Sequence, residues 1–296
     1  MQNDTRNQLF VLLQYLLPQH LISRWVGALA ASSQPLIKNF LARRFIQRYG
    51  VDLSEAKHQN IEDFATFNDF FTRALREDAR SWPLDKTIMG CPADGCISQL
   101  GQVEAGRIFQ AKGQYFDLLE LLGGDENAAK QFAGGNFATI YLSPRDYHRV
   151  HMPCRGQLER MIHVPGDLFS VNAATAQHVP RLFARNERVI CLFNTSHGPV
   201  AMILVGAMIV ASIATPWAGL VAPLQRKIRI THYGQHLAPP LLERGDEMGR
   251  FLLGSTVILL TGANQSTWNN ELSAGTPVQM GMPLGAWTHA TTPSTS

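Results

Sequence analysis

The first 50 residues repeat apolar side chains at the spacing of amphipathic helices. Positions 9–17 are apolar except for Gln14, and Pro18 ends this run. Apolar residues then recur every three or four positions over 21–29 and again over 36–45, which predicts two further helices with one apolar face each. The first run can lie on a bilayer but is too short to cross it, because a spanning helix needs roughly 20 apolar residues.

The pattern changes from helical to strand-like along the next part of the chain. A fourth helix is predicted from about Thr66 to the charged cluster at 76–80, with Phe67, Phe71 and Leu75 on its apolar face. Later segments are short apolar runs between turn-forming residues, which is typical of strands. The predicted strands are 90–100, 137–142, 148–152, 158–164, 189–193, 228–231 and 255–261, and two helices are predicted among them at 115–122 and 127–132.

Residues 189–225 contain no Asp, Glu, Lys or Arg, but they do not predict a membrane span. Their strictly apolar part, residues 200–211, lies between turn-forming residues. Its valines and isoleucines favour strands buried on both faces, with a bend at Gly206. The whole pattern predicts an α+β fold, with N-terminal helices over residues 1–80 on a strand-rich domain over residues 81–296.

Composition and charge indicate a globular protein that does not bind nucleic acid. The 296 residues are 45% hydrophobic and carry a net charge of only +3. The positive charge is concentrated in residues 1–50, which hold six basic residues against Asp4 alone. A basic amphipathic start predicts peripheral binding to an anionic membrane surface. The alternative is a helical cap packed on the domain behind it.

The cysteines and the start of the chain indicate a cytosolic protein. Cys91, Cys96, Cys154 and Cys191 form no C-x-x-C pair and have no histidines at zinc-finger spacing. We interpret them as reduced thiols in the core. Residues 1–30 lack the pattern of a secretory signal peptide, so export is not expected.

Three polar segments interrupt the predicted strands and carry the residue types of a nucleophilic site. They are Pro92-Ala93-Asp94-Gly95, residues 143–151 (SPRDYHRVH) and Leu253-Gly254-Ser255-Thr256. Asp94, His151 and Ser255 could form a triad, in which the imidazole takes the serine proton and the carboxylate orients the imidazole. Taken singly, they also suit a turn, a core histidine and a small-residue strand entry. A metal site at His148 and His151 would need a third ligand and helical geometry, so no metal is expected.

These segments resemble phosphatidylserine decarboxylases in the short proenzyme form found in bacteria. The resemblance covers nearly the whole chain and is weakest over residues 225–243 and after 262. It is carried by residues 67–71 (FNDFF), 92–95 (PADG), 141–151 (YLSPRDYHRVH), 165–172 (PGDLFSVN), 183–188 (FARNER) and 249–256 (GRFLLGST).

The resemblance implies an enzyme that makes its own pyruvoyl cofactor from Ser255. Ser255 would attack the carbonyl carbon of Gly254, with His151 as the base and Asp94 orienting that base. A glycine at this position has no Cβ to obstruct the attack. The cut would give fragments 1–254 and 255–296, which stay together as a heterodimer; whether two heterodimers pair is left open.

The implied reaction converts phosphatidylserine to phosphatidylethanolamine and carbon dioxide at the cytoplasmic face of the inner cell membrane, with the protein bound peripherally. His148 is then the best candidate to hold the substrate carboxylate or to protonate the α-carbon. The residue types at these positions are also compatible with two other functions. A membrane-associated lipid serine hydrolase would use Ser255, His151 and Asp94 in one intact chain, whereas a non-enzymatic lipid-binding module would tolerate replacement of all three.

Overall fold

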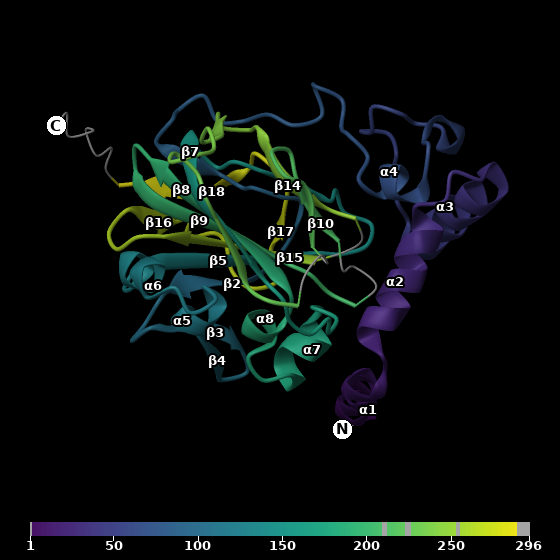
Figure 1. The fold of residues 1–296 in the computed structure, drawn as a ribbon, viewed down its shortest axis with the longest axis horizontal. Coiled ribbons are helices and arrows are strands. Elements are labelled where there is room, and N and C mark those ends of the chain that lie inside the picture. Colours follow the sequence, from purple (N-terminus) through teal and green to yellow (C-terminus); the bar gives the residue numbers. More distant parts are fainter. Residues whose placement is uncertain (1, 209–211, 223–225, 253–254, 289–296) are drawn as a thin grey trace.

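Helices and strands segregate along the chain in the computed structural model, which describes residues 2–208, 212–222, 226–252 and 255–288. Helices α1 (Gln2–Leu16), α2 (Gln19–Ala30) and α3 (Pro35–Tyr49) come first, and a strand-rich body follows. The three helices lie along one side of that body (Figure 1). The α+β class and the three N-terminal helices are therefore confirmed, while the domain boundary at residue 80 stays a prediction.

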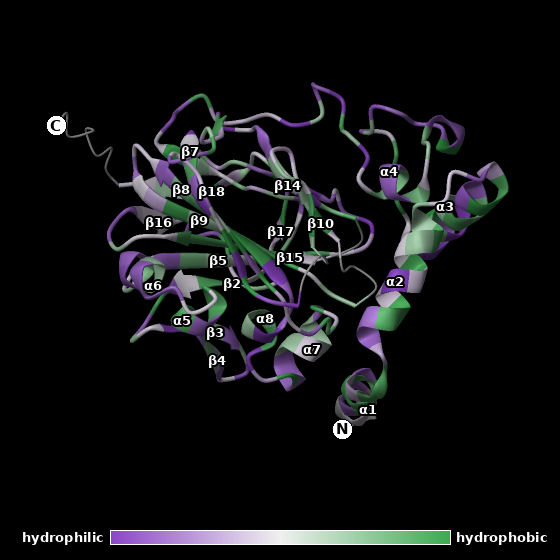
Figure 2. Ribbon diagram, viewed as in Figure 1, coloured by the Kyte–Doolittle hydropathy of each residue, from purple (hydrophilic) through white to green (hydrophobic). Residues whose placement is uncertain are grey.

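The N-terminal helices carry many hydrophobic residues (Figure 2), and several of these side chains are exposed to solvent. The exposed fraction is 75% for Leu16, 73% for Trp25 and 88% for Leu36. The positive charge is less exposed than the sequence indicates, because Lys38 is buried and donates to the carbonyl groups of Ile61 and Glu62. No helix among the described residues has the length and apolar character needed to cross a membrane.

The helix predicted near Thr66 begins where expected but is much shorter. Helix α4 spans only Phe67–Phe71, and Thr66 and Asp69 form a capping box at its start. After α4, Leu75 pairs with Ala56 in an isolated bridge. The prediction that this helix continues to residues 76–80 is therefore wrong, because the chain turns to pair its backbone with the segment that precedes the short 3-10 helix η1 (Ile61–Asp63).

A nine-stranded antiparallel sheet forms the centre of the strand-rich body. Its order is β12-β7-β8-β9-β15-β5-β2-β17, and β13 also pairs with β7. Strand β15 lies between β9 and β5, and all seven of its residues are buried. The strands are β2 (Gly95–Gln102), β5 (Asn136–Leu142), β7 (Gly156–Val164), β8 (Arg188–Thr195), β9 (Gly198–Val205), β12 (Arg229–His232), β13 (Leu241–Leu242), β15 (Ser255–Thr261) and β17 (Pro277–Val278).

A second sheet has four strands, in the order β11 (Gly219–Ala222), β10 (Ile213–Thr215), β14 (Glu247–Phe251) and β6 (Arg149–His151). The chain passes from this sheet to the large one where β14 ends at Phe251 and β15 begins at Ser255. Two smaller sheets complete the body. They are β1 (Ile88–Gly90), β18 (Pro283–Trp287) and β16 (Ser266–Trp268), and the pair β3 (Arg107–Ala111) and β4 (Gln114–Asp117).

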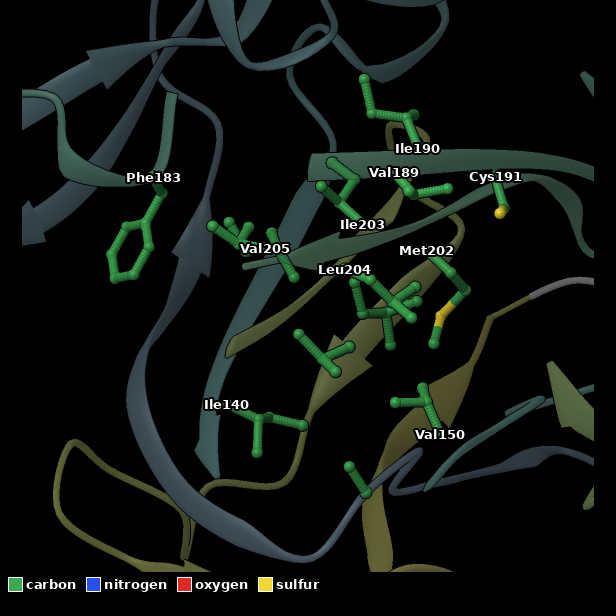
Figure 3. Packing of buried hydrophobic residues seen from close by; sticks show 14 of the residues in the cluster. Ile140, Val150, Phe183, Val189, Ile190, Cys191, Met202, Ile203, Leu204 and Val205 are labelled. Atoms are coloured by element: carbon green, nitrogen blue, oxygen red, sulfur yellow. The ribbon is translucent and has the colours of Figure 1, made fainter. Parts of the chain in front are cut away.

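The apolar core is built mainly from the large sheet. Figure 3 shows buried side chains of this sheet, among them Ile140 of β5 and the paired Ile190 of β8 and Ile203 of β9. Residues 189–193 and 200–205 are each exposed by 2% or less, which explains the absence of charge there and confirms the predicted buried strands. Strand β9 ends at Val205, beside the predicted bend at Gly206, and residues 209–211 of the apolar run lie outside the described residues.

Short elements differ most from the sequence prediction. The helix predicted at 115–122 is strand β4 followed by α5 (Leu118–Leu121), and the side chain of Asp117 caps the first turn of α5. The strand predicted at 90–100 is two strands, β1 and β2, separated by the turn that contains Asp94. The structure confirms α6 (Glu126–Phe132) and adds α7 (Ala173–His178) and α8 (Leu182–Arg185), which are too short to produce a helical repeat.

The four cysteines are free thiols. Cys91, Cys154 and Cys191 are buried, as predicted, whereas Cys96 is only half-buried. The prediction of core thiols therefore holds for three of the four.

Candidate active site

The pairing of three strands brings the polar segments to one edge of the large sheet. Ser255, the first residue of β15, pairs with Leu142, the last residue of β5. Strand β2 pairs with the other side of β5, so that Cys96 lies opposite Tyr141. The turn that contains Asp94, the segment after Leu142 and the start of β15 therefore lie at the same edge.

Asp94 is bound on both carboxylate oxygens. Nη2 of Arg80 lies 2.5 Å from Oδ2 of Asp94, and the backbone N–H of Met280 donates to Oδ1 over 2.8 Å. Arg80 also reaches Glu55 over 2.8 Å, and its side chain is only 6% exposed. The sequence reasoning missed Arg80, which ties Asp94 to the segment that follows α3.

A polar cavity of about 150 Å³ lies beside Asp94. Arg73, Asp146 and Tyr147 line part of it. Arg73 is buried and donates to the carbonyl oxygens of Arg145 and Asp146. The cavity therefore gives a small polar group room beside the Asp94 carboxylate.

His151 lies on β6 with hydrogen bonds at both ring nitrogens. Nδ1 is 2.7 Å from the carbonyl oxygen of Gly245, and Nε2 is 3.0 Å from the hydroxyl oxygen of Tyr147. Burial lowers the pKa of His151, while the Gly245 carbonyl and the charge of Glu247 act in the opposite direction. The imidazole is therefore neutral at physiological pH, as a general base must be.

Ser255 is 1% exposed, and its Oγ has no hydrogen-bond partner among the described residues. An unpartnered buried hydroxyl is unfavourable and often marks a site with a chemical role. The backbone places the other two residues near each other, because the N–H of His151 donates to the carbonyl oxygen of Pro92 over 2.8 Å. The side chains of Asp94, His151 and Ser255 make no hydrogen bond to one another in the described part of the chain.

His148 is completely buried and stacks on Phe71 of α4. The ring centroids are 4.0 Å apart with an interplanar angle of 21°. Burial, followed by the charge of Arg73, lowers the pKa of His148 to about 3. Neither ring nitrogen makes a well-formed hydrogen bond to a residue that the structure describes, although the nearby carbonyl groups of Ser143 and Pro144 oppose the lowering of the pKa. His148 is therefore neutral at physiological pH.

The site holds a buried serine hydroxyl, two neutral histidines and a carboxylate. Gly254, the predicted site of attack, lies outside the described residues. The described residues contain no group of three or more His, Cys, Asp or Glu side chains placed to bind a metal ion. The chemistry that these residues offer is nucleophilic and acid–base.

Comparison with known proteins identifies relatives that match this chain over all the candidate site residues. Residues 67–286 match the family described as phosphatidylserine decarboxylase, and residues 9–50 match a family described as PSD. The chain is 58% identical to a phosphatidylserine decarboxylase proenzyme of Bordetella petrii, over 93% of this chain and 96% of that protein. It is 55% identical to the proenzyme of the same name from Pseudomonas fluorescens, over 95% of this chain and 98% of that protein. The chain belongs to the phosphatidylserine decarboxylase family.

Proposed function

We propose that this enzyme converts phosphatidylserine to phosphatidylethanolamine and carbon dioxide, using a pyruvoyl group that it generates from Ser255. The observation that carries the proposal is the buried, unpartnered hydroxyl of Ser255 at the first position of the central strand β15. The names of the relatives support the substrate and the existence of a precursor. A hydroxyl with no competing partner is free to react with the peptide bond that precedes it.

The self-cleavage begins when the Oγ of Ser255 attacks the carbonyl carbon of Gly254 and gives up its proton. The bond from this carbonyl to the nitrogen of Ser255 breaks, which leaves an ester and a free amine. Elimination then releases the carboxyl group of Gly254 and leaves dehydroalanine at position 255. One water molecule hydrolyses this residue to a pyruvoyl group and ammonia, so all atoms are accounted for.

His151 takes the proton of Ser255, because its ring is neutral and its backbone N–H binds Pro92, close to the turn that carries Asp94. Asp94 favours the protonated form of His151 through its charge, as the direction of its effect on the pKa of His151 indicates. The carboxylate is bound to Arg80 and not to the imidazole, so this role is electrostatic in the described arrangement.

The pyruvoyl group fits the start of β15, because the hydroxyl that it replaces is buried and makes no hydrogen bond that would be lost. Its ketone, once joined to the substrate amine, stabilises the negative charge that departing carbon dioxide leaves on the α-carbon. His148 is the candidate to hold the carboxylate or to protonate the α-carbon. Since its ring is neutral, it would hold the carboxylate as an uncharged hydrogen-bond donor, and it could protonate the α-carbon only after taking up a proton.

The fragments 1–254 and 255–296 remain together after the cut. Strand β15 pairs along its length with β5 on one side and with β9 on the other. Its Val257, Ile258, Leu259 and Leu260 are fully buried. Separation would expose these side chains to water at a cost of roughly 1.5–3 kcal/mol each.

The N-terminal helices bind the cytoplasmic face of an anionic inner membrane peripherally. Their exposed apolar side chains include Trp25 and Leu36, and Arg24, Arg44 and Arg48 are exposed beside them. An apolar cavity of about 570 Å³, lined by residues of α2 and α3, opens among these helices. Basic residues next to an apolar surface favour an interfacial position.

The intact mass of the purified protein tests this function. The wild-type protein should give two chains that separate between Gly254 and Ser255, and Ser255→Ala should give one chain of 296 residues. The processed protein should release carbon dioxide from phosphatidylserine in vesicles. A lipid serine hydrolase would instead remain one chain and react with fluorophosphonates.

A further inference from the structure

The hydrogen bonds of His151 assign its tautomer. The carbonyl oxygen of Gly245 can only accept, so Nδ1 carries the proton and donates over 2.7 Å. In the neutral ring Nε2 then holds the lone pair. The hydroxyl of Tyr147, 3.0 Å away, must therefore donate to Nε2.

Backbone hydrogen bonds fix the Gly245 carbonyl beside Nδ1 of His151. The segment between β13 and β14 is tied to the body here, where the N–H of Gly245 donates to the carbonyl of Met152 and the N–H of Met152 donates to the carbonyl of Asp246. Gly245 has a φ of 90°, a conformation that favours glycine. A backbone group thus fixes the tautomer, which is the role that the triad scheme gives to a carboxylate.

Burial and a neighbouring turn fix the position of Tyr147. It is 5% exposed, and its ring lies 5.7 Å from the His151 ring with an interplanar angle of 24°. A turn just before it is closed by two hydrogen bonds between Ser143 and Asp146, of 2.9 and 2.7 Å. Burial raises the pKa of Tyr147, so the hydroxyl stays protonated and remains a donor.

We propose that Tyr147 is a positioning residue that occupies the basic nitrogen of His151 before self-cleavage, and that Ser255 must displace the Tyr147 hydroxyl in order to react. The proposal rests on the proposed function of His151 as the base. The lone pair of Nε2 accepts one strong hydrogen bond, and Tyr147 supplies it while the Oγ of Ser255 has no partner. Tyr147 therefore restrains the precursor.

The kinetics of self-cleavage in Tyr147→Phe test this role. Precursor made by cell-free synthesis is sampled at pH 8, where His151 is neutral, and the 254-residue fragment is quantified by mass spectrometry. Tyr147→Phe should be cut about three- to tenfold faster than wild type, because a neutral hydrogen bond no longer has to be exchanged. Tyr115→Phe, which removes an exposed hydroxyl on β4, is the matched control and should be cut at the wild-type rate.

The outcomes separate this inference from the proposed function. An equal or slower rate for Tyr147→Phe would overturn the role of Tyr147 while leaving the self-cleavage intact. An uncut wild-type chain, or normal cutting of His151→Ala, would overturn both.

A second measurement does not depend on the folding of Tyr147→Phe. Full-length Ser255→Ala labelled with ¹⁵N-histidine should show His151, assigned by comparison with the additional His151→Ala change, with its proton on Nδ1. A proton on Nε2 would contradict the assignment, because Tyr147 could not then donate to that nitrogen.

Discussion

Lowering the pH from 7 to 5 should destabilise the fold through His148. The folded protein holds the pKa of this residue at about 3, whereas an unfolded chain leaves it near 6.5. Between these values the unfolded state binds a proton that the folded state does not. The contribution of a neutral His148 is therefore fully retained above the unfolded pKa and is lost as the pH falls towards 3.

The size of this effect follows from the two pKa values. At pH 5 about 97% of unfolded chains carry the His148 proton and almost no folded chains do, which corresponds to about 2 kcal/mol of unfolding free energy. At pH 7 the loss from the same residue is only about 0.2 kcal/mol. The difference depends on the unfolded pKa and hardly at all on the folded one, because any folded pKa well below 5 gives the same result.

Urea unfolding of Ser255→Ala, which the proposed function keeps as one chain, measures this effect. The comparison is with Ser255→Ala/His148→Asn, in which residue 148 does not titrate. Between pH 7 and pH 5 the first protein should lose about 2 kcal/mol more unfolding free energy than the second. The other histidines, including His151, contribute to both proteins and cancel. Parallel pH profiles would show that His148 is accessible to water and protons, and would refute the reasoning from its burial.

Four further substitutions test the site and the N-terminal helices. His148→Ala should still be cut and borohydride should still link phosphatidylserine to its 42-residue fragment, but carbon dioxide release should fall by about 10²–10⁴-fold; a rate within a few-fold of wild type would remove His148 from the mechanism. Arg80→Met leaves the Asp94 carboxylate buried beside a neutral side chain and should cost about 3–5 kcal/mol in urea unfolding; an unchanged midpoint would contradict the importance of that ion pair. Trp25→Ser and Phe40→Ser should each weaken sedimentation with anionic vesicles about tenfold or more and leave the salt dependence in place; unchanged binding would return α2 and α3 to the role of a structural cap.

Local patterns in the sequence predicted the elements that depend on local interactions. The helices α1 to α3 follow from an apolar repeat, and β15 follows from an apolar run after Gly254. The predicted helix near Thr66 is too long at its C-terminal end. The apolar spacing of Leu75 agrees with a helix, but the backbone of Leu75 pairs with Ala56. Tertiary pairing overrode the helical pattern there.

The surroundings of the site residues could not be read from the sequence, since they come from distant segments. Gly245 is 94 residues from His151, and its carbonyl occupies the nitrogen that the triad scheme reserves for Asp94. Arg80 is 14 residues from Asp94 and appears in the sequence only as part of a charged cluster. The candidate site residues came from the sequence and their roles stay predictions, whereas the groups bonded to them emerge from the fold.

The central claim is that Ser255 becomes the first residue of a separate chain, and the mass of that chain tests it most directly. Denaturing mass spectrometry of wild-type protein should give a 254-residue fragment that ends in a free carboxyl group at Gly254. The 42-residue fragment should be lighter by about 17 Da than the same peptide with an intact serine, because conversion of Ser255 to a pyruvoyl group removes the elements of ammonia. One chain of 296 residues, or a 42-residue fragment that begins with serine, would contradict the account.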